Sequence, residues 1–265
     1  MNRRGGRSSV GGMNELVHLD VNGGVATITL DSPRNRNALS AQVRRELRAH
    51  LGAAIGDPAA RVIVLTHTGR VFCSGMDLTE SRGASVGDQG VNELPALLQQ
   101  ILTSPTPVLA RVAGPARAGG VGLVAACDIA VAAASATFAF SEVRIGVVPA
   151  VISVTVLPRL MPRAAHELFL TGETFDADRA ERIGLINSAV PDAGLDAEVY
   201  RYTDMLRRGA PGALAATKAM LQPPSAVLVD RFAEMTALSA RHFAGPEAQE
   251  GMAAFAAKRS PTWVT

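Results

Sequence analysis

Apolar and polar positions alternate in the first part of the chain and follow helical spacing further on. In residues 16–33, LVHLDVNGGVATITLDSP, apolar residues occupy every second position on both sides of Asn22-Gly23-Gly24, which predicts a β-hairpin. Ser40 is then a suitable N-cap for a helix that ends before Pro58, because one apolar stripe runs through Val43, Leu47, Leu51 and Ile55. The pattern therefore predicts a strand pair followed by an amphipathic helix.

Further apolar runs continue the alternation of strands and helices. Four of them predict strands: RVIVLTH (61–67), PVLARVAG (107–114), DIAVAAA (128–134) and TFAFSE (137–142). The segment LTESRGASVGDQGVNEL (78–94) predicts a polar loop that leads into a helix, and from about residue 163 the apolar spacing is mainly helical. We find no linker long enough to separate two independent domains. The order of elements predicts an α/β domain with a helical appendage.

The composition fits a folded chain with much apolar surface to bury. Hydrophobic residues make up 48% and charged residues 19% of the 265, with a formal net charge of +2. This charge, without interleaved basic and aromatic residues, argues against a nucleic-acid partner, and no apolar run reaches the ~18 residues of a membrane span. Cys73 and Cys127 fit a reducing compartment, so we expect a cytoplasmic protein. Residues 1–12, MNRRGGRSSVGG, are expected to form a flexible tail.

Two glycine-centred segments are the strongest candidates for chemistry. ARAGGVGLVAACD (116–128) and GRVFCSGMDL (69–78) each follow a predicted buried strand. The first formally contains the dinucleotide-binding pattern G-x-G-x-x-A from Gly120, but only LVAAC separates Gly122 from the next strand, which leaves no room for the crossover helix. Two interpretations stay open. The glycines serve close packing alone, or the two loops present converging backbone N–H groups to the oxyanion of a thioester carbonyl.

Four motifs in order resemble the crotonase superfamily, the enoyl-CoA hydratase/isomerase family. They are NRNALS (35–40), FCSGMDL (72–78), GPARAGGVGLVAACDIAVA (114–132) and FAFSEVRIGVVPAVIS (138–153), and the resemblance runs from about Asn14 to Trp263. It is closest to a bacterial branch that includes methylglutaconyl-CoA hydratase-like proteins. The resemblance implies an α/β, crotonase-like spiral of ββα units over residues 13–200. A helical region over residues 201–265 would then assemble homotrimers or dimers of trimers.

The same resemblance implies the catalytic groups. The backbone N–H groups of Met76 and Gly119 match the pair that binds the thioester oxygen in the family, and Glu142 matches an acid–base glutamate. Apolar residues around Glu142 are expected to raise its pKa. Well-studied hydratases carry a second glutamate, and at that position this chain has Gly122.

Coenzyme A, carried by the substrate, needs cations for its phosphates and a site for its adenine. By resemblance, Arg34 and Arg70 lie near the nucleotide, and Phe255 and Lys258 match C-terminal positions that reach it. The other residues expected to contact substrate are Arg36, Ala38, Ser74, Gly75, Asp77, Leu78, Ala118, Gly120 and Gly122. Asp77 is expected to orient its own loop. The five histidines are scattered, without a paired acidic residue or metal-ligand spacing, so we expect no metal and no separate cofactor.

Three functions follow from these residues, in order of preference. The first is hydration of a 2-enoyl-CoA through an enolate. The second is enoyl-CoA isomerisation, which needs only one carboxylate to carry a proton between C2 and C4 and is therefore favoured by Gly122. The third is an acyl-CoA-binding protein without catalysis, since loss of one glutamate is a step in that direction.

Overall fold

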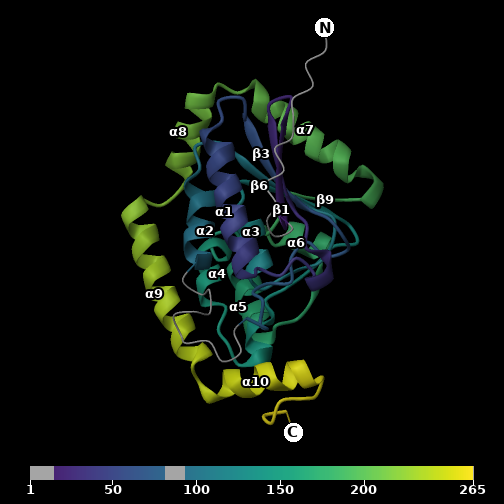
Figure 1. Ribbon diagram of the computed structural model, residues 1–265, viewed down its shortest axis with the longest axis vertical. Helices are drawn as coiled ribbons and strands as arrows, with labels where there is room; N and C mark the ends of the chain where they lie inside the picture. Colours follow the sequence, from purple (N-terminus) through teal and green to yellow (C-terminus); the bar gives the residue numbers. More distant parts are fainter. Residues whose placement is uncertain (1–14, 81–92, 265) are drawn as a thin grey trace.

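The computed structural model describes residues 15–80 and 93–264, so the predicted tail lies outside the described residues. A six-stranded sheet with the order β1-β2-β3-β4-β6-β9 forms its framework (Figure 1). Within this six-stranded sheet of the described residues, β1 and β2, the predicted hairpin, pair antiparallel, and the other neighbouring strands pair parallel. The strands span Val17–Asn22, Val25–Leu30, Val62–His67, Val108–Val112, Ile129–Ala133 and Ser188–Val190.

Helices cover both faces of this sheet, as expected for parallel strands. All six residues of β3 are buried, yet they divide between two clusters: Ile63 and Leu65 join the main core, whereas Val64 packs in a smaller cluster with residues of α7 (Leu195–Arg208). The main core includes α1 (Ala41–Gly56) and α2 (Glu93–Thr103). The helix α1 begins as predicted, because the Ser40 hydroxyl accepts a hydrogen bond from the backbone N–H of Val43.

Short strands form a second layer beside the large sheet. This three-stranded sheet has the order β5-β7-β8, from Ala116–Arg117, Thr137–Ala139 and Phe175–Asp176. A strand of the large sheet, a strand of the small one and a helix follow one another twice: β4, β5 and α3 (Gly119–Ala126), then β6, β7 and the region of α4 (Ala150–Val156). The predicted ββα units are therefore present.

Three local expectations need correction. The segment interpreted as leaving no room for a crossover helix holds the eight-residue α3, which begins at the glycine pair itself. TFAFSE is a strand only up to Ala139, and Ser141–Ile145 forms a 3-10 helix, η2. The part expected to be mainly helical also contains β8 and β9, which have two and three residues and are too short for a period-2 pattern to reveal.

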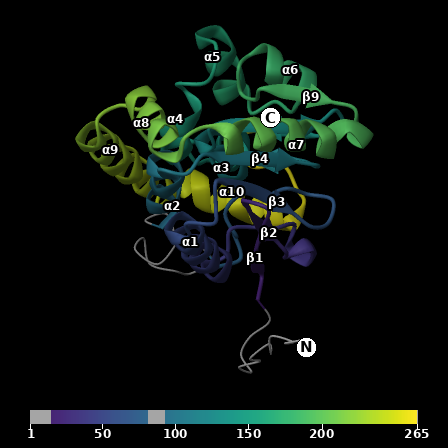
Figure 2. The same ribbon diagram turned by 90° about the horizontal axis from the view of Figure 1, so that it is seen from above.

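The C-terminal helices surround the sheets. Helix α5 spans Pro162–Thr171, α6 Ala177–Arg182, α8 Pro211–Leu221, α9 Ser225–Phe243 and α10 Pro246–Ala257. Helices α8 and α9 occupy one flank of the molecule, opposite β9, and α10 crosses its lower end in Figure 1 (Figures 1 and 2). The buried Lys218 anchors α8, because its Nζ donates to the Asp128 carboxylate at 2.7 Å and to the Ile101 carbonyl at 2.9 Å. Among the described helices, none is long and apolar enough to cross a membrane.

Candidate active site

A cavity of about 900 Å³ lies where the loops after the strands meet the C-terminal helices. Its walls come from the NRNALS loop, the FCSGMDL loop, the start of α3, η2 with the start of α4, and parts of α9 and α10. Segments far apart in the sequence therefore share one cavity. Such a cavity is the expected place for a small-molecule site.

The two glycine-centred loops contact each other directly at this cavity. The N–H of Arg117 donates to the Cys73 carbonyl at 2.9 Å, and a Cβ at Gly120 would lie only 2.5 Å from the same carbonyl oxygen. Gly75 has a φ of +92°, and a Cβ there would lie 3.5 Å from the backbone nitrogen of Gly119. Gly120 therefore serves close packing, and Gly75 serves both a left-handed turn and the approach of the loops.

Two backbone N–H groups at this contact have no acceptor in the part of the chain that the structure describes. Within residues 15–80 and 93–264, neither Met76 N–H nor Gly119 N–H donates to another group, and both residues line the cavity. Between β5 and α3 the chain passes through Ala118 at φ +48° and ψ −119°, a conformation that alanine adopts only under strain. Strain of this kind costs about 1–3 kcal/mol and clusters at functional sites. The pair of N–H groups is thus available to an oxygen in the cavity.

The NRNALS loop supports the FCSGMDL loop through backbone hydrogen bonds. The N–H of Leu39 donates to the Gly75 carbonyl at 2.8 Å, and the N–H of Ser74 donates to the Arg36 carbonyl at 3.1 Å. Asn37 is fully buried, and its side-chain amide donates to two carbonyls, those of Thr68 and Val71. This buried amide holds the loop in a left-handed turn that asparagine tolerates better than most residues.

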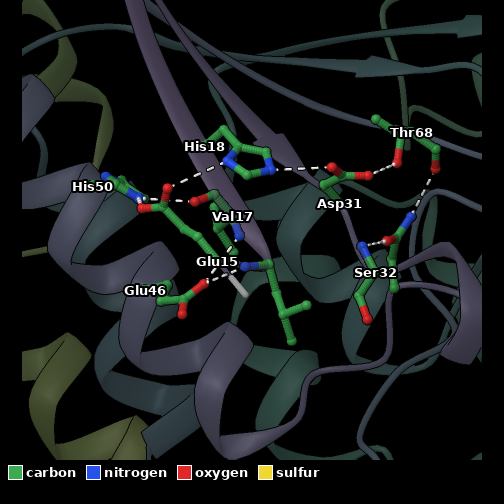
Figure 3. Close-up of polar contacts among 10 residues, drawn as sticks. Glu15, Val17, His18, Asp31, Ser32, Glu46, His50 and Thr68 are labelled. Carbon is green, nitrogen blue, oxygen red and sulfur yellow. Dashed lines mark hydrogen bonds and ion pairs between the residues drawn. The ribbon is translucent and has the colours of Figure 1, made fainter. Parts of the chain in front are cut away.

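A polar network on the hairpin continues this support (Figure 3). Nε2 of His18 lies 3.0 Å from Oδ2 of Asp31, and the Thr68 hydroxyl donates to the same carboxyl group. The Thr68 hydrogen bond, followed by that of His18, lowers the pKa of Asp31. On the other side, Glu15 contacts both His18 and His50. The expectation that histidines lack paired acids is therefore wrong for His18 and His50, although no metal-binding cluster occurs among the described residues.

Glu142 extends from η2 into the cavity wall. Its Oε2 is buried and receives no hydrogen bond from any described residue. Burial raises the pKa of Glu142 to about 7, from an ordinary value of 4.5, and outweighs the hydrogen bond of its own backbone N–H, which lowers it. The carboxyl group can therefore take up or release a proton near neutral pH, which a general acid–base requires.

Gly122 and Ile152 fit together beside this site. A Cβ at Gly122 would lie 2.6 Å from Cγ2 of Ile152, and Ile152 lines the cavity. The Ile152 side chain thus occupies the space that the Cβ of a larger residue at position 122 would need. An apolar side chain therefore lines the cavity beside position 122, and Glu142 lines the same cavity.

The comparison with known families agrees with this geometry. A family profile described as Enoyl-CoA hydratase/isomerase matches residues 20–265. The chain belongs to the enoyl-CoA hydratase/isomerase family. It is 38% identical to a Rhodobacter capsulatus protein named "Probable enoyl-CoA hydratase", over 92% of this chain and 96% of that one. It is 34% identical to the carnitinyl-CoA dehydratase of Escherichia coli O157:H7, over 95% and 99%.

A solved structure of the family has the same fold. The crystal structure of an enoyl-CoA hydratase from Mycobacterium avium is 46% identical, covers 95% of this chain and 100% of its own, and superposes with a TM-score of 0.84. The predicted crotonase fold and the prediction of an enzyme of the enoyl-CoA hydratase/isomerase family are thereby confirmed.

Within this family framework, most of the predicted site residues come together. The cavity is lined by Arg34, Arg36, Ala38, Ser74, Met76, Asp77, Leu78, Ala118, Gly119, Glu142 and Phe255. Oδ1 of Asp77 accepts hydrogen bonds from the N–H and the hydroxyl of Thr79, which orients its own loop as expected. The thiol of Cys73 is buried, which raises its pKa to about 12 and leaves it unreactive.

Five of the predicted residues are not among those that line the cavity. Gly75, Gly120 and Gly122 face other backbone or side-chain atoms, as described above. Lys258 ends α10 in a left-handed, exposed position, and the backbone of Arg70 packs against Gly114. The sequence interpretation missed other lining residues, among them Arg117, Arg144 and Arg259. Arg144 lies two residues after Glu142, and this proximity was the one signal that could have indicated it.

Proposed function

We propose that this enzyme adds water across the double bond of a 2-enoyl-CoA. The observation that carries the proposal is one cavity lined by Met76 and Gly119, whose N–H groups have no partner among the described residues, and by Glu142, whose pKa is close to neutral. An acyl-thioester whose oxygen accepts both N–H groups would develop enolate charge at that oxygen. Each donor aimed at such a charge contributes about 2.7–4 kcal/mol to the transition state.

Glu142 can carry the one proton that hydration transfers, from water to C2. Its carboxylate takes a proton from water while the water oxygen bonds to C3 and the double-bond electrons move onto the thioester oxygen as an enolate. The protonated Glu142 then gives this proton to C2, the carbonyl re-forms, and the carboxylate is restored. A pKa near neutral suits both halves of this cycle.

The remaining lining residues suit the two ends of the substrate. No described carboxylate pairs with Arg34, Arg36 or Arg144, so these guanidinium groups can bind the phosphates of coenzyme A, Arg144 through its terminal nitrogens because its Nε donates to the Thr171 carbonyl at 3.1 Å. Aliphatic and aromatic side chains form the wall near Glu142, and they favour an apolar acyl chain: Leu94, Ile145, Val148, Val151, Ile152 and Phe243.

One observation favours isomerisation as a second candidate. Ile152 fills the space beside Gly122, so a second carboxylate does not face Glu142 from that position. A single carboxylate is sufficient to carry a proton between C4 and C2 of a 3-enoyl-CoA. The acyl-CoA-binding protein is the third candidate, and it requires no proton transfer.

The enoyl-thioester absorbance of crotonyl-CoA or methylglutaconyl-CoA distinguishes the three candidates. We expect the enzyme to remove this absorbance by hydration and Glu142→Gln to lower kcat by about 10²–10⁴-fold with KM little changed. Glu173→Gln, on the exposed surface, is the matched control. Conjugation gained from a 3-enoyl-CoA without uptake of water would select isomerase, and binding without turnover by either enzyme form would select the binder.

A further inference from the structure

Helix α10 contacts the segment that carries Glu142 backbone to backbone. A Cβ at Gly251 of α10 would lie 2.3 Å from the carbonyl oxygen and 2.7 Å from the Cα of Ile145. From the other side, a Cβ at Gly146 would lie 2.4 Å from the carbonyl oxygen of Glu247. Each of the two elements thus supplies a glycine at the point where the other approaches, and no larger residue fits at either position without a shift.

Both contacts fall on the turn that presents Glu142. Ile145 is the last residue of η2, three positions after Glu142, and a 3-10 helix has three residues per turn, so the two side chains share one face. Both line the cavity. Gly146 ends this helix in a left-handed conformation, with its N–H directed to the carbonyls of Glu142 and Val143. A displacement of α10 would therefore also displace the η2 backbone that holds Glu142.

The presence of Gly251 within α10 requires a structural explanation. Interior glycines weaken a helix relative to alanine. Gly251 is buried near the middle of α10, where the approach of Ile145 accounts for it. At Gly212, the second residue of α8, no described atom outside its own helix backbone and its chain neighbours lies within 4 Å of the hypothetical Cβ. A glycine-to-alanine substitution at position 251 would therefore disturb the contact with Ile145, whereas the same substitution at position 212 would disturb no such contact.

We propose that α10 fixes the position of the Glu142 carboxyl group, with Gly251 and Gly146 as positioning residues that act through the backbone of η2. This inference rests on the proposed acid–base function of Glu142. Residues of α10 and the segment after it also complete the cavity wall, namely Gly251, Phe255, Arg259 and Pro261. Separation of α10 from η2 would therefore both displace the carboxyl group and admit water beside it.

Nearby charges do not explain the environment of Glu142. Among the described residues, the charged ones that line the cavity with it are Arg144 on η2, Arg117 on β5, Asp77 in the FCSGMDL loop, Arg36 in the NRNALS loop, Arg34 just before that loop, and Arg259 after α10. Arg259 pairs with Glu250 at 2.7 Å. The raised pKa of Glu142 arises from burial and not from any of these charges. A change in the packing of α10 against η2 should therefore change the pKa of Glu142.

The test compares Gly251→Ala with Gly212→Ala in the full-length enzyme. For Gly251→Ala we expect kcat to fall at least ~10-fold with KM little changed, as a carboxyl group displaced by a fraction of an ångström predicts. The midpoint of Glu142, followed by the ¹³C signal of its carboxyl carbon and assigned with Glu142→Gln, should move from about 7 towards 4.5. Gly212→Ala should leave kcat and the midpoint unchanged.

Two results would overturn the proposal. One is a folded Gly251→Ala enzyme with the wild-type midpoint and kcat, and the other is a loss of kcat that follows only the loss of folded protein. Should Gly251→Ala not fold, Ala248→Gly replaces it, because this buried residue lies on α10 beside Gly146, and exposed Ala253→Gly is its control. Unchanged kcat and midpoint in Ala248→Gly would also refute it. Full turnover by Glu142→Gln would instead refute the proposed function, since the carboxyl signal is measured without substrate.

Discussion

The carboxyl group of Glu142 carries a cost for the folded state that depends on pH. Its pKa is about 7 in the fold and near the ordinary 4.5 in the unfolded chain. Between these values the unfolded chain has lost the proton while the folded chain keeps it, so stability falls as pH rises through this window. A shift of this size corresponds to about 3 kcal/mol above neutral pH, and none below pH 4.5.

Glu142→Gln should therefore stabilise the protein at alkaline pH while it lowers activity. We expect its free energy of unfolding at pH 8 to exceed that of the wild type by about 3 kcal/mol, and the difference to vanish near pH 4. Urea unfolding at both pH values measures it, with Glu173→Gln as the exposed control. An equal effect of Glu142→Gln at both pH values would show that the carboxyl group titrates normally in the fold.

At the residue scale, the three residues predicted to be catalytic line one cavity, whereas the full set of lining residues was predicted less well. Met76, Gly119 and Glu142 could be selected because the motifs around them keep a fixed order and spacing. The sequence pattern alone could not distinguish Gly120 and Gly122 from Gly119. A glycine that packs against Cys73 or Ile152 looks the same in the sequence as a glycine that presents its N–H group to a ligand. Arg259 was missed because its approach to the cavity depends on the path of the chain after α10.

At the element scale, the crossing of α3 and α4 depends on Gly122. The hypothetical Cβ at this position is 2.6 Å from Cγ2 and 3.2 Å from Cβ of Ile152. Gly122→Ala should therefore destabilise the protein by about 1–3 kcal/mol, as overpacking of a core does. In a Gly122→Ala background, Ile152→Ala removes the clashing Cγ2, whereas Ile152→Val keeps it.

A double-mutant cycle by urea unfolding measures this contact. We expect the pair Gly122→Ala and Ile152→Ala to be less destabilised than the sum of the two single changes by about 0.5–3 kcal/mol. The pair with Ile152→Val should show the smaller coupling. Additive effects in both pairs would mean that α3 and α4 move apart freely at this point.

Elements with a long pattern were predictable, and those held only by tertiary contacts were not. The hairpin β1–β2 and the helix α1 have alternation, a turn and an N-cap within one stretch of chain. By contrast, β8 has two residues and exists because it pairs with β7. The 3-10 helix η2 replaces the end of a predicted strand, where Gly146 in a left-handed conformation closes the turn.

At the scale of the whole molecule, apolar side chains remain exposed on one flank. Met220 and Leu221 at the end of α8 are 75% and 73% exposed, and Val227 and Val229 at the start of α9 are about half exposed. These four residues, named here the α8–α9 surface, lie within the region 201–265 that the family resemblance assigns to trimer formation. Adjacent exposed apolar residues of this size are typical of surfaces that bind another protein.

We propose that the α8–α9 surface binds further copies of the chain. Sedimentation equilibrium should then give a mass of 3 × 27.6 = 82.8 kDa for a trimer, or twice that for a dimer of trimers. Met220→Glu with Leu221→Glu should lower this mass towards 27.6 kDa, because burial of two unpaired carboxylates in an interface is strongly unfavourable. Leu170→Glu, a change at a residue of α5 that is 76% exposed, is the matched control. A wild-type protein that sediments as a single 27.6 kDa species at micromolar concentration would contradict the assembly and leave the exposed residues of α8 and α9 to another partner.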